Sequence, residues 1–305
     1  MPDAETAAGH GALYVIGLGP GDPSLLTPEA AGIMEQVTVI AGYSGYIDLI
    51  EPARLAGKRV ISTGMTGELA RANAAVDAAI GGENTVVVCS GDPGVSALSG
   101  LVLDILEQRG INPDVLPFRV SPGIPAVCAA AALLGAPLMH DFACISLSDL
   151  LTPWELILNR LEHAFAGDFV VVLYNPRSKR RSGHLAGALE IALRHREGTC
   201  PVGVVRNAFR PNQRVSVTRL ADCDPEDADM FTLLIIGNSA TRIVPGGGDA
   251  PLSWAYGARI LTASGYSDKY SDLGTGNKQA RPDHDGGSKS TFFSSWLTKH
   301  HCQLT

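Results

Sequence analysis

The chain has 305 residues, of which 45% are hydrophobic and 6% aromatic, and its formal net charge is −7. This composition is typical of a globular protein with room for two domains, and the acidic balance argues against a broad nucleic-acid surface. No apolar run reaches the ~18 residues of a membrane span, and residues 1–11 lack the pattern of a signal peptide. We therefore expect a cytoplasmic protein with a short disordered leader over 1–11 and no nucleic-acid or membrane partner.

The first 120 residues alternate between apolar, β-branched runs and helical patterns. Thr27, followed by Pro28 and Glu29, is typical of a helix start. The alternation predicts a largely parallel sheet covered on both faces, within an N-terminal α/β domain over 12–120. The predicted strands are 12–17, 37–42, 58–63, 84–91 and 113–118, and the predicted helices are 28–36, 67–80 and 95–109.

A second set of elements follows a connecting helix and linker over 121–142, in which 121–134 is predicted to be one helix of small residues. We expect a C-terminal α/β domain over 143–244, whose last two strands have no helix between them. This predicts a mixed sheet that ends in a hairpin-like pair. Beyond it, 245–305 is predicted to be a Gly-rich, partly disordered tail with a strand only in "ARILTASGY". The predicted strands are 142–148, 168–175, 201–208, 213–220 and 230–239, and the predicted helices are 153–165 and 183–194.

The cysteines do not suggest a metal or redox site. None forms a CxxC pair, and no Cys or His lies at zinc-ligand spacing. Several lie in apolar runs such as "VVVCSG", which predicts buried, reduced thiols. The six are Cys89, Cys128, Cys144, Cys200, Cys223 and Cys302.

The loop "GLGPGDPSLLT", which follows the first predicted strand, resembles a phosphate cradle but lacks its features. A dinucleotide fingerprint needs a third glycine where this chain has Asp22. Pro20 removes a backbone donor that an anion would use, and the loop carries no basic residue. The pattern therefore argues against a phosphate site.

A second loop, "CSGDPGVSA", repeats the acidic Gly-Pro theme after a different strand. Two such loops at strand ends indicate a crevice at the carboxyl edge of the sheet, where α/β proteins bind ligands. A carboxylate there suits a ligand with hydroxyls or a cation. S-adenosylmethionine has both and no phosphate, although two ordinary tight turns would give the same spacing.

Five segments together resemble the tetrapyrrole methylase family: "GLGPGDPSLLT", "SGDPGVSAL", "SPGIPAVCAAAALLGAPL", "LYNPRS" and "IIGNSATR". The likeness runs in order over about 12–244. Within the family, five segments resemble the branch that methylates precorrin-3B at C17 in cobalamin biosynthesis: "AGYSGYIDLI", "SLSDLLTPW", "LYNPRS", "VVRNA" and "IIGNS". The resemblance implies two α/β domains with a cofactor cleft between them, usually in a homodimer. It also implies methylation by S-adenosylmethionine that gives precorrin-4 with ring contraction; cobalt-factor III is the alternative substrate.

The resemblance implies a set of cofactor-binding positions in this chain. They are Pro20, Ser90, Gly91, Asp92, Val95, Pro125, Ala126, Asn175 and Ala208. Uroporphyrinogen methylases of the family carry an acidic residue shortly after the second strand, and here that register falls on Gly42 and Tyr43. Either a different base is therefore used, or none is needed. The polar candidates near the loops are Asp22, Tyr43 and Asp92, and we expect Asp22 and Tyr43 to be the catalytic residues.

The residues that bind the substrate are predicted from the distribution of charge in the sequence. A corrin precursor is a polycarboxylate tetrapyrrole, so an acidic protein must gather positive charge locally to bind it. The segment "NPRSKRRSGH" and the residues after a later strand do so, although each could equally lie in a solvated basic loop. The proposed substrate-binding residues are Arg177, Lys179, Arg180, Arg181 and Arg206, with Arg210 beside them.

Three other functions remain open at this point. A methylase of the same superfamily could act on RNA ribose or on a protein, although the net charge weighs against RNA. A module could bind S-adenosylmethionine or a tetrapyrrole without turnover. A nicotinamide oxidoreductase is disfavoured by the missing third glycine.

Overall fold

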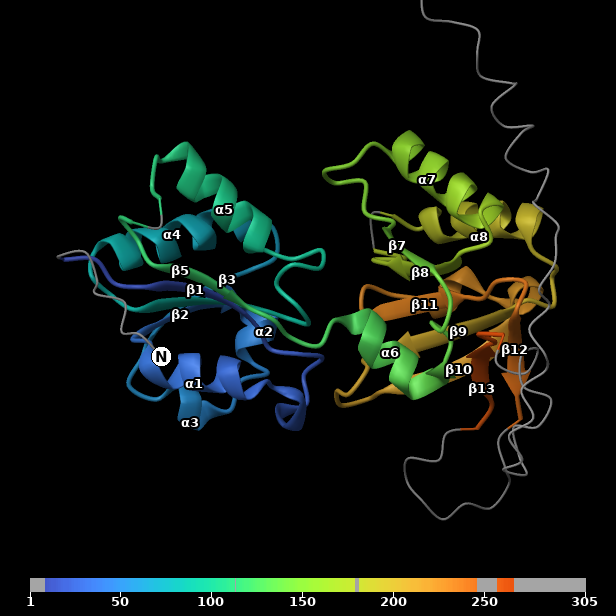
Figure 1. Cartoon of the computed structure of the whole chain (residues 1–305), viewed down its shortest axis with the longest axis horizontal. Helices are drawn as coiled ribbons and strands as arrows, with labels where there is room; N and C mark the ends of the chain where they lie inside the picture. The colour runs from blue at the N-terminus through green and yellow to red at the C-terminus, as the bar shows by residue number, and fades with distance from the viewer. Residues whose placement is uncertain (1–8, 113, 179–180, 246–256, 266–305) are drawn as a thin grey trace, which may run out of the picture. The chain divides into compact units, whose positions relative to one another are not determined.

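The structure is a computed structural model that describes residues 9–112, 114–178, 181–245 and 257–265. The described residues up to Ala263 form one compact unit that contains two five-stranded sheets and a small third sheet. Both large sheets are layered with helices, so the predicted α/β fold class is confirmed (Figure 1). The division into domains at 120 and 142 stays a prediction.

The first sheet is entirely parallel, in the order β3-β2-β4-β1-β5. Its central strands are buried along their length, as β-branched runs between two helical layers should be. The strands are β1 (Leu13–Gly17), β2 (Val39–Tyr43), β3 (Arg59–Thr63), β4 (Thr85–Cys89) and β5 (Phe118–Ser121).

Helices cover both faces of this sheet, with α4 and α5 on one side and α1 and α3 on the other (Figure 1). Helix α1 is capped as predicted, since Thr27 Oγ1 accepts a hydrogen bond from the backbone N–H of Ala30 at 3.2 Å. The helices are α1 (Pro28–Gln36), α2 (Ser44–Ile47), α3 (Pro52–Leu55), α4 (Glu68–Ile80) and α5 (Ser99–Gln108), with a short 3₁₀ helix at Pro23–Leu25.

Two predicted elements of this half were misplaced. The strand predicted at 113–118 begins only at Phe118, because the Asn112 side chain accepts hydrogen bonds from the backbone of Asp114 and Val115 and so closes a turn. The helix predicted from residue 95 begins at Ser99, because Ser96 has a left-handed backbone (φ 52°) that a helix cannot contain.

The second sheet is mixed, as predicted, in the order β10-β9-β11-β8-β7. Strand β9 lies between β10 and β11 and is antiparallel to both, so the predicted pairing of the last two strands is wrong. Strand β10 instead folds back on β9 as a hairpin, which leaves the other edge of β9 for β11. The strands are β7 (Phe142–Ser146), β8 (Val170–Tyr174), β9 (Pro201–Arg206), β10 (Arg214–Arg219) and β11 (Thr232–Ile236), and two 3₁₀ turns, Leu220–Asp222 and Pro225–Asp227, join the last two.

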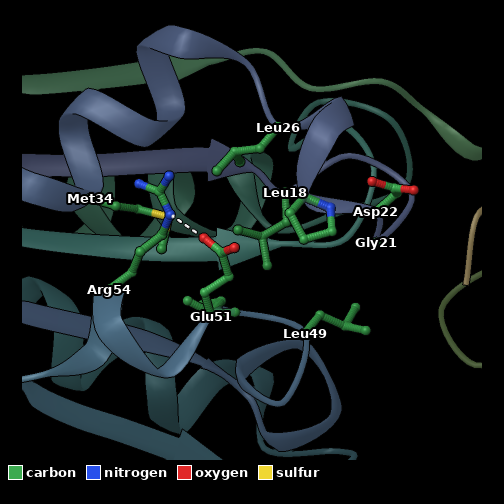
Figure 2. A pocket seen from close by; sticks show the side chains of 10 residues that line it. Leu18, Gly21, Asp22, Leu26, Met34, Leu49, Glu51 and Arg54 are labelled. Atoms are coloured by element: carbon green, nitrogen blue, oxygen red, sulfur yellow. Dashed lines mark hydrogen bonds and ion pairs between the residues drawn. The ribbon is translucent and has the colours of Figure 1, made fainter.

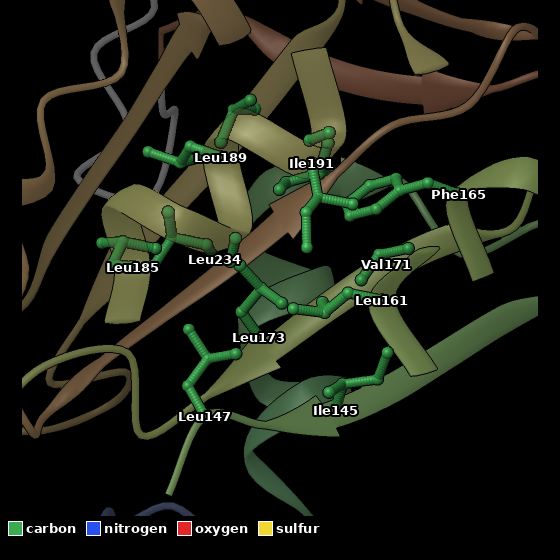
Figure 3. Close-up of a cluster of buried hydrophobic side chains, with 14 of the residues drawn as sticks. Ile145, Leu147, Leu161, Phe165, Val171, Leu173, Leu185, Leu189, Ile191 and Leu234 are labelled. Carbon is green, nitrogen blue, oxygen red and sulfur yellow. The ribbon is translucent and has the colours of Figure 1, made fainter. Parts of the chain in front are cut away.

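Helices α7 (Trp154–Ala166) and α8 (His184–His195) pack on one face of this sheet, and α6 (Ala126–Leu134) packs on the other. Figure 3 shows Leu161 and Phe165 of α7 packed with side chains of α8 and of the sheet. Helix α6 begins at Ala126 rather than at residue 121, because Pro125 holds the preceding backbone extended.

A small third sheet joins β6 (Gly135–Ala136), β12 (Thr241–Val244) and β13 (Arg259–Thr262). Strand β13 is the strand predicted from "ARILTASGY", and its Ile260 is buried against α6 and the second sheet. Of the disordered leader predicted over 1–11, residues 1–8 lie outside the described residues, as does most of the predicted tail. Residues 9–11 are described and are not disordered, since the Gly11 N–H donates to the carbonyl oxygen of Ala79 at 2.8 Å. None of the helices in the described ranges is long and apolar enough to cross a membrane.

The thiols are buried only in part. Cys89 and Cys200 are buried as predicted, but Cys128 and Cys144 are exposed. Cys128 lies on the side of α6 away from the sheet, where an apolar sequence run does not ensure burial. Cys302 lies outside the described residues, within which no cluster of three or more His, Cys, Asp or Glu side chains could hold a metal ion.

Candidate functional site

The glycine loops after β1 and β4 pack directly against each other. Gly19 and Gly91 exchange two backbone hydrogen bonds, at 3.1 and 2.7 Å, and both have left-handed φ angles, 68° and 70°. The turn after β5 closes on the same point, since a Cβ added to Gly123 would lie 2.1 Å from the Gly91 carbonyl oxygen. The glycines therefore allow three backbone segments to meet.

Asp92 holds these loops together. Its Oδ1 accepts from the Gly94 N–H at 2.8 Å, and its Oδ2 accepts from the Gly123 N–H at 3.0 Å. The carboxylate thus bridges the loop after β4 to the turn after β5. Each oxygen keeps a further lone pair for a ligand hydroxyl or ammonium.

A cavity of about 240 Å³, called the central pocket below, lies beside the paired loops. It is lined by the carboxyl ends of strands from both large sheets and by the start of α6. Parallel strands β1 and β4 place their loops at one edge of the first sheet, and β8 and β9 do the same in the second. The central pocket brings together all nine positions expected to hold a cofactor: Pro20, Ser90, Gly91, Asp92, Val95, Pro125, Ala126, Asn175 and Ala208.

Two asparagines occupy equivalent places in the pocket. Asn175 follows β8 and Asn207 follows β9, and each has φ of 51°. Asparagine is one of the few residues with a side chain that tolerates this conformation. The sequence prediction missed Asn207, although "YN" and "RN" both place asparagine directly after a buried strand.

Tyr174 connects the second sheet to α6. Its hydroxyl accepts a hydrogen bond from the backbone N–H of Val127 at 2.9 Å, in the first turn of a helix that has no side-chain cap of its own. Burial raises the pKa of Tyr174 to about 12, so the phenol is neutral at physiological pH.

Of the proposed catalytic pair, only Tyr43 lines the central pocket. Its ring meets that of Tyr46 edge to face, with centroids 5.1 Å apart, and Tyr46 also lines the pocket. Burial raises the pKa of Tyr46 as well, which favours its neutral, hydrogen-bond-donating form.

Asp22 lies elsewhere. It borders a small cavity of about 20 Å³ with Leu18 and Leu26 (Figure 2). Its carboxylate accepts hydrogen bonds from the Ser24 hydroxyl at 2.7 Å and the Ser24 N–H at 2.9 Å, and these bonds lower its pKa. A carboxylate so placed caps the 3₁₀ helix that follows and is a poor proton acceptor.

Three of the proposed substrate-binding arginines, Arg177, Arg181 and Arg206, are engaged within the chain and do not line the central pocket. Arg177 pairs with Glu226, and Arg206 pairs with Asp229 at 2.7 Å. Arg181 donates to the carbonyl oxygens of Leu147 and Asn175, both at 3.1 Å. Lys179 and Arg180 lie outside the described residues, so Arg210 is the predicted cation that the structure places in the pocket wall.

Known proteins similar to this chain share one enzyme family. The family model for tetrapyrrole (corrin/porphyrin) methylases matches residues 12–224. A Salmonella typhimurium protein named probable cobalt-factor III C(17)-methyltransferase is 43% identical over 234 residues, which are 77% of this chain and 95% of that protein. A Sinorhizobium protein named precorrin-3B C(17)-methyltransferase is 40% identical over 244 residues, 79% of this chain and 94% of that protein.

Comparison with solved structures also finds a methyltransferase. The crystal structure of the methyltransferase CobJ matches with a TM-score of 0.73 and 39% identity, covering 83% of this chain and all of that one. The family match covers more than half of the chain and includes every residue that lines the central pocket except 230–233, at the start of β11. The chain belongs to the tetrapyrrole methylase family.

Proposed function

We propose that this chain transfers a methyl group from S-adenosylmethionine to C17 of a corrin precursor, converting precorrin-3B to precorrin-4 with ring contraction in cobalamin biosynthesis. One observation carries the proposal: the nine positions implied by the family resemblance line one pocket, although they come from loops up to about 190 residues apart. The names of the two similar methyltransferases supply the substrate class.

The pocket offers suitable surroundings for this methyl donor. Val205, Leu233 and Ala126 provide apolar wall, while the Ser90 hydroxyl and the Asp92 carboxylate provide polar groups. S-adenosylmethionine, when bound, supplies a methyl group on a sulfonium sulfur that is already activated toward an electron-rich carbon. The protein's contribution is then to align the reactants and exclude water.

The positions of the polar side chains limit which of them can act as an acid or a base in the reaction. Tyr43 remains the proposed polar group for moving a proton, because it lines the central pocket and Asp22 does not. The neutral phenols of Tyr46 and Tyr174 donate or accept hydrogen bonds without carrying charge. Alignment therefore carries most of the proposed catalysis.

The test is mass spectrometry after anaerobic incubation of the full chain with methyl-labelled S-adenosylmethionine. Metal-free precorrin-3B and its cobalt counterpart, cobalt-factor III, are offered in separate reactions. We expect one labelled methyl group on one of them, and the substrate that reacts decides between the two names carried by the relatives. No transfer to either, with S-adenosylhomocysteine binding intact, overturns the proposal and leaves a binding module or another methylase.

A matched pair of variants tests whether the central pocket is the site. Ala126 and Ala132 lie on the same helix, but Ala126 lines the pocket and Ala132 is exposed. Ala126→Leu should fill the pocket and lower both S-adenosylhomocysteine affinity and methyl transfer. Ala132→Leu should change neither; equal behaviour of the two variants would contradict this location.

We also propose the homodimer and the cytoplasmic location that the family resemblance implies. Sedimentation equilibrium of the full chain tests the first, since a dimer has twice the 32.0 kDa mass of the chain. A monomer at micromolar concentration would contradict it. Cell fractionation tests the second.

A further inference from the structure

Arg210 lies in the wall of the central pocket with most of its donors unused. Its Nε donates to the carbonyl oxygen of Pro20, and its Nη2 donates to the Ser90 hydroxyl at 2.5 Å. A guanidinium has five N–H donors. Both Nη1 hydrogens and the second Nη2 hydrogen therefore have no partner among the residues that the structure describes.

The charge of Arg210 is also unpaired within the described residues, in contrast to the arginines nearby. Arg177 and Arg206 each form an ion pair, whereas Arg210 forms none. Asp92 also lines the pocket, but its carboxylate accepts from two backbone N–H groups and forms no ion pair with Arg210. Burial lowers the pKa of Arg210, and the neutral phenol of Tyr46 does not offset the cation. A partly buried cation without a counterion is costly unless a ligand supplies one.

The chain holds this side chain in place from two directions. Arg210 lies in the turn between β9 and β10, where Asn207 and Phe209 have left-handed φ angles of 51° and 55°. On the facing loop, a Cβ added to Gly21 would lie 2.8 Å from the Arg210 Cγ and Nε. The second glycine of "GPGD" thus leaves room for the arginine, which the phosphate interpretation of that loop could not explain.

We propose that Arg210 is a carboxylate-binding residue of the central pocket, and that its free N–H groups receive a carboxylate of a bound reactant. Two reactants could supply that group: the amino-acid end of the methyl donor, or an acidic side chain of the tetrapyrrole. The inference rests on the proposed function for the identity of these reactants. It does not rest on methyl transfer being observed.

The experiment compares ligands as well as variants. Calorimetry measures binding of S-adenosylhomocysteine and of its decarboxylated analogue to the wild-type chain, to Arg210→Gln and to Arg210→Lys. If the guanidinium binds the donor's carboxylate, the wild type should prefer S-adenosylhomocysteine by about 10- to 100-fold, and Arg210→Gln should lose that preference. Arg210→Lys, which keeps the charge, should retain part of it.

The second arm measures the KM for the tetrapyrrole. If the substrate supplies the carboxylate, Arg210→Gln should raise this KM about 10- to 100-fold while S-adenosylhomocysteine affinity stays unchanged. Arg214→Gln is the control, because Arg214 is an exposed arginine of the same hairpin that lies outside the pocket wall. Its binding constants should match the wild type.

The outcomes separate this inference from the proposed function. If the wild type prefers S-adenosylhomocysteine to its decarboxylated analogue but transfers no methyl group, the proposed function is wrong and the inference stands. If Arg210→Gln folds, and neither ligand preference nor KM changes more than about twofold, the inference is wrong. If Arg210→Gln does not fold, Arg210→Met, which also removes the charge, takes its place. An unchanged KM in that variant, together with the wild type's failure to discriminate the decarboxylated analogue, overturns the inference.

Discussion

Gly123→Ala should displace the loops that form the central pocket. The added Cβ would lie 2.1 Å from the Gly91 carbonyl oxygen and 2.8 Å from the Gly17 Cα, whereas ordinary contacts begin at 3.4 Å. All of these neighbours are backbone atoms, so no side chain can turn aside. The segments must separate by roughly 1 Å, which strains the Asp92 bridge to the Gly123 N–H.

We expect this substitution to cost about 3 kcal/mol, the upper end of the usual range for overpacking a closely packed site. For a unit of this size, that loss lowers the melting temperature by roughly 6–12 °C. Calorimetric affinity for S-adenosylhomocysteine should fall as well, because Gly91 and Asp92 move. Differential scanning calorimetry and titration calorimetry on the same preparation measure both quantities.

Gly32→Ala is the matched control. Gly32 lies within α1, and a Cβ there would meet no atom within 4 Å. Alanine in the interior of a helix is favoured over glycine by about 0.5–1 kcal/mol, so the melting temperature should rise. If Gly123→Ala melts with the wild type and binds S-adenosylhomocysteine equally well, the close approach of the three loops is wrong.

Three further predictions concern a hydrogen bond, an ion pair and two thiols elsewhere in the structure. Tyr174→Phe removes the acceptor for the Val127 N–H and should lower the free energy of unfolding by about 1 kcal/mol in urea titrations; an unchanged midpoint would mean that water replaces the hydroxyl. Burial raises the pKa of Asp229, but hydrogen bonds from Arg206 and other donors outweigh burial, so the pKa in the folded protein is lowered. The ionised Asp229 therefore stabilises the fold at pH values above its ordinary pKa of 3.8, and this stabilisation is lost as pH falls through the lower pKa of the folded protein. Asp229→Asn should therefore be less stable than the wild type at neutral pH, and the difference in urea midpoints should shrink in acid; a constant difference would contradict this. Maleimide labelling of the native protein, located by peptide mass spectrometry, should modify exposed Cys128 and spare buried Cys89.

Most of the elements could be predicted from local sequence, because their causes are local. The run "TVVVC" is β-branched and buried on both faces, and its strand was predicted within two residues at each end. The helix cap at Thr27 could be predicted as well, because it depends only on Thr27 and the residues that follow it. Proline restricts the backbone of the residue before it, and Pro125 sets the start of α6 at Ala126 instead of the predicted residue 121.

Pairing between distant segments could not be predicted in the same way. The order β10-β9-β11 depends on which edge of β9 is left free after the β9–β10 hairpin forms. The local sign of that order is burial: β11 is a largely apolar run that is buried at every position, whereas β10 alternates and is partly exposed, as an edge strand is. The ion-pair partners of the arginines could not be predicted from local sequence either. Arg177 and Arg206 looked available in sequence, but their partners Glu226 and Asp229 lie 49 and 23 residues away.

The glycine loops show that a motif can locate a site without contributing the groups that a ligand contacts. Their positions in the sequence correctly marked the carboxyl edge of the first sheet, since Gly19 and Gly91 follow neighbouring parallel strands. The glycines themselves, however, are required by backbone contacts between loops and by the Arg210 side chain that lies over Gly21. What a ligand meets is therefore the set of groups that this packing fixes in place, namely the Ser90 hydroxyl, the Asp92 carboxylate and the Arg210 guanidinium. Chemical specificity in this pocket should follow those three side chains, and the glycines should act on it only by holding them in position.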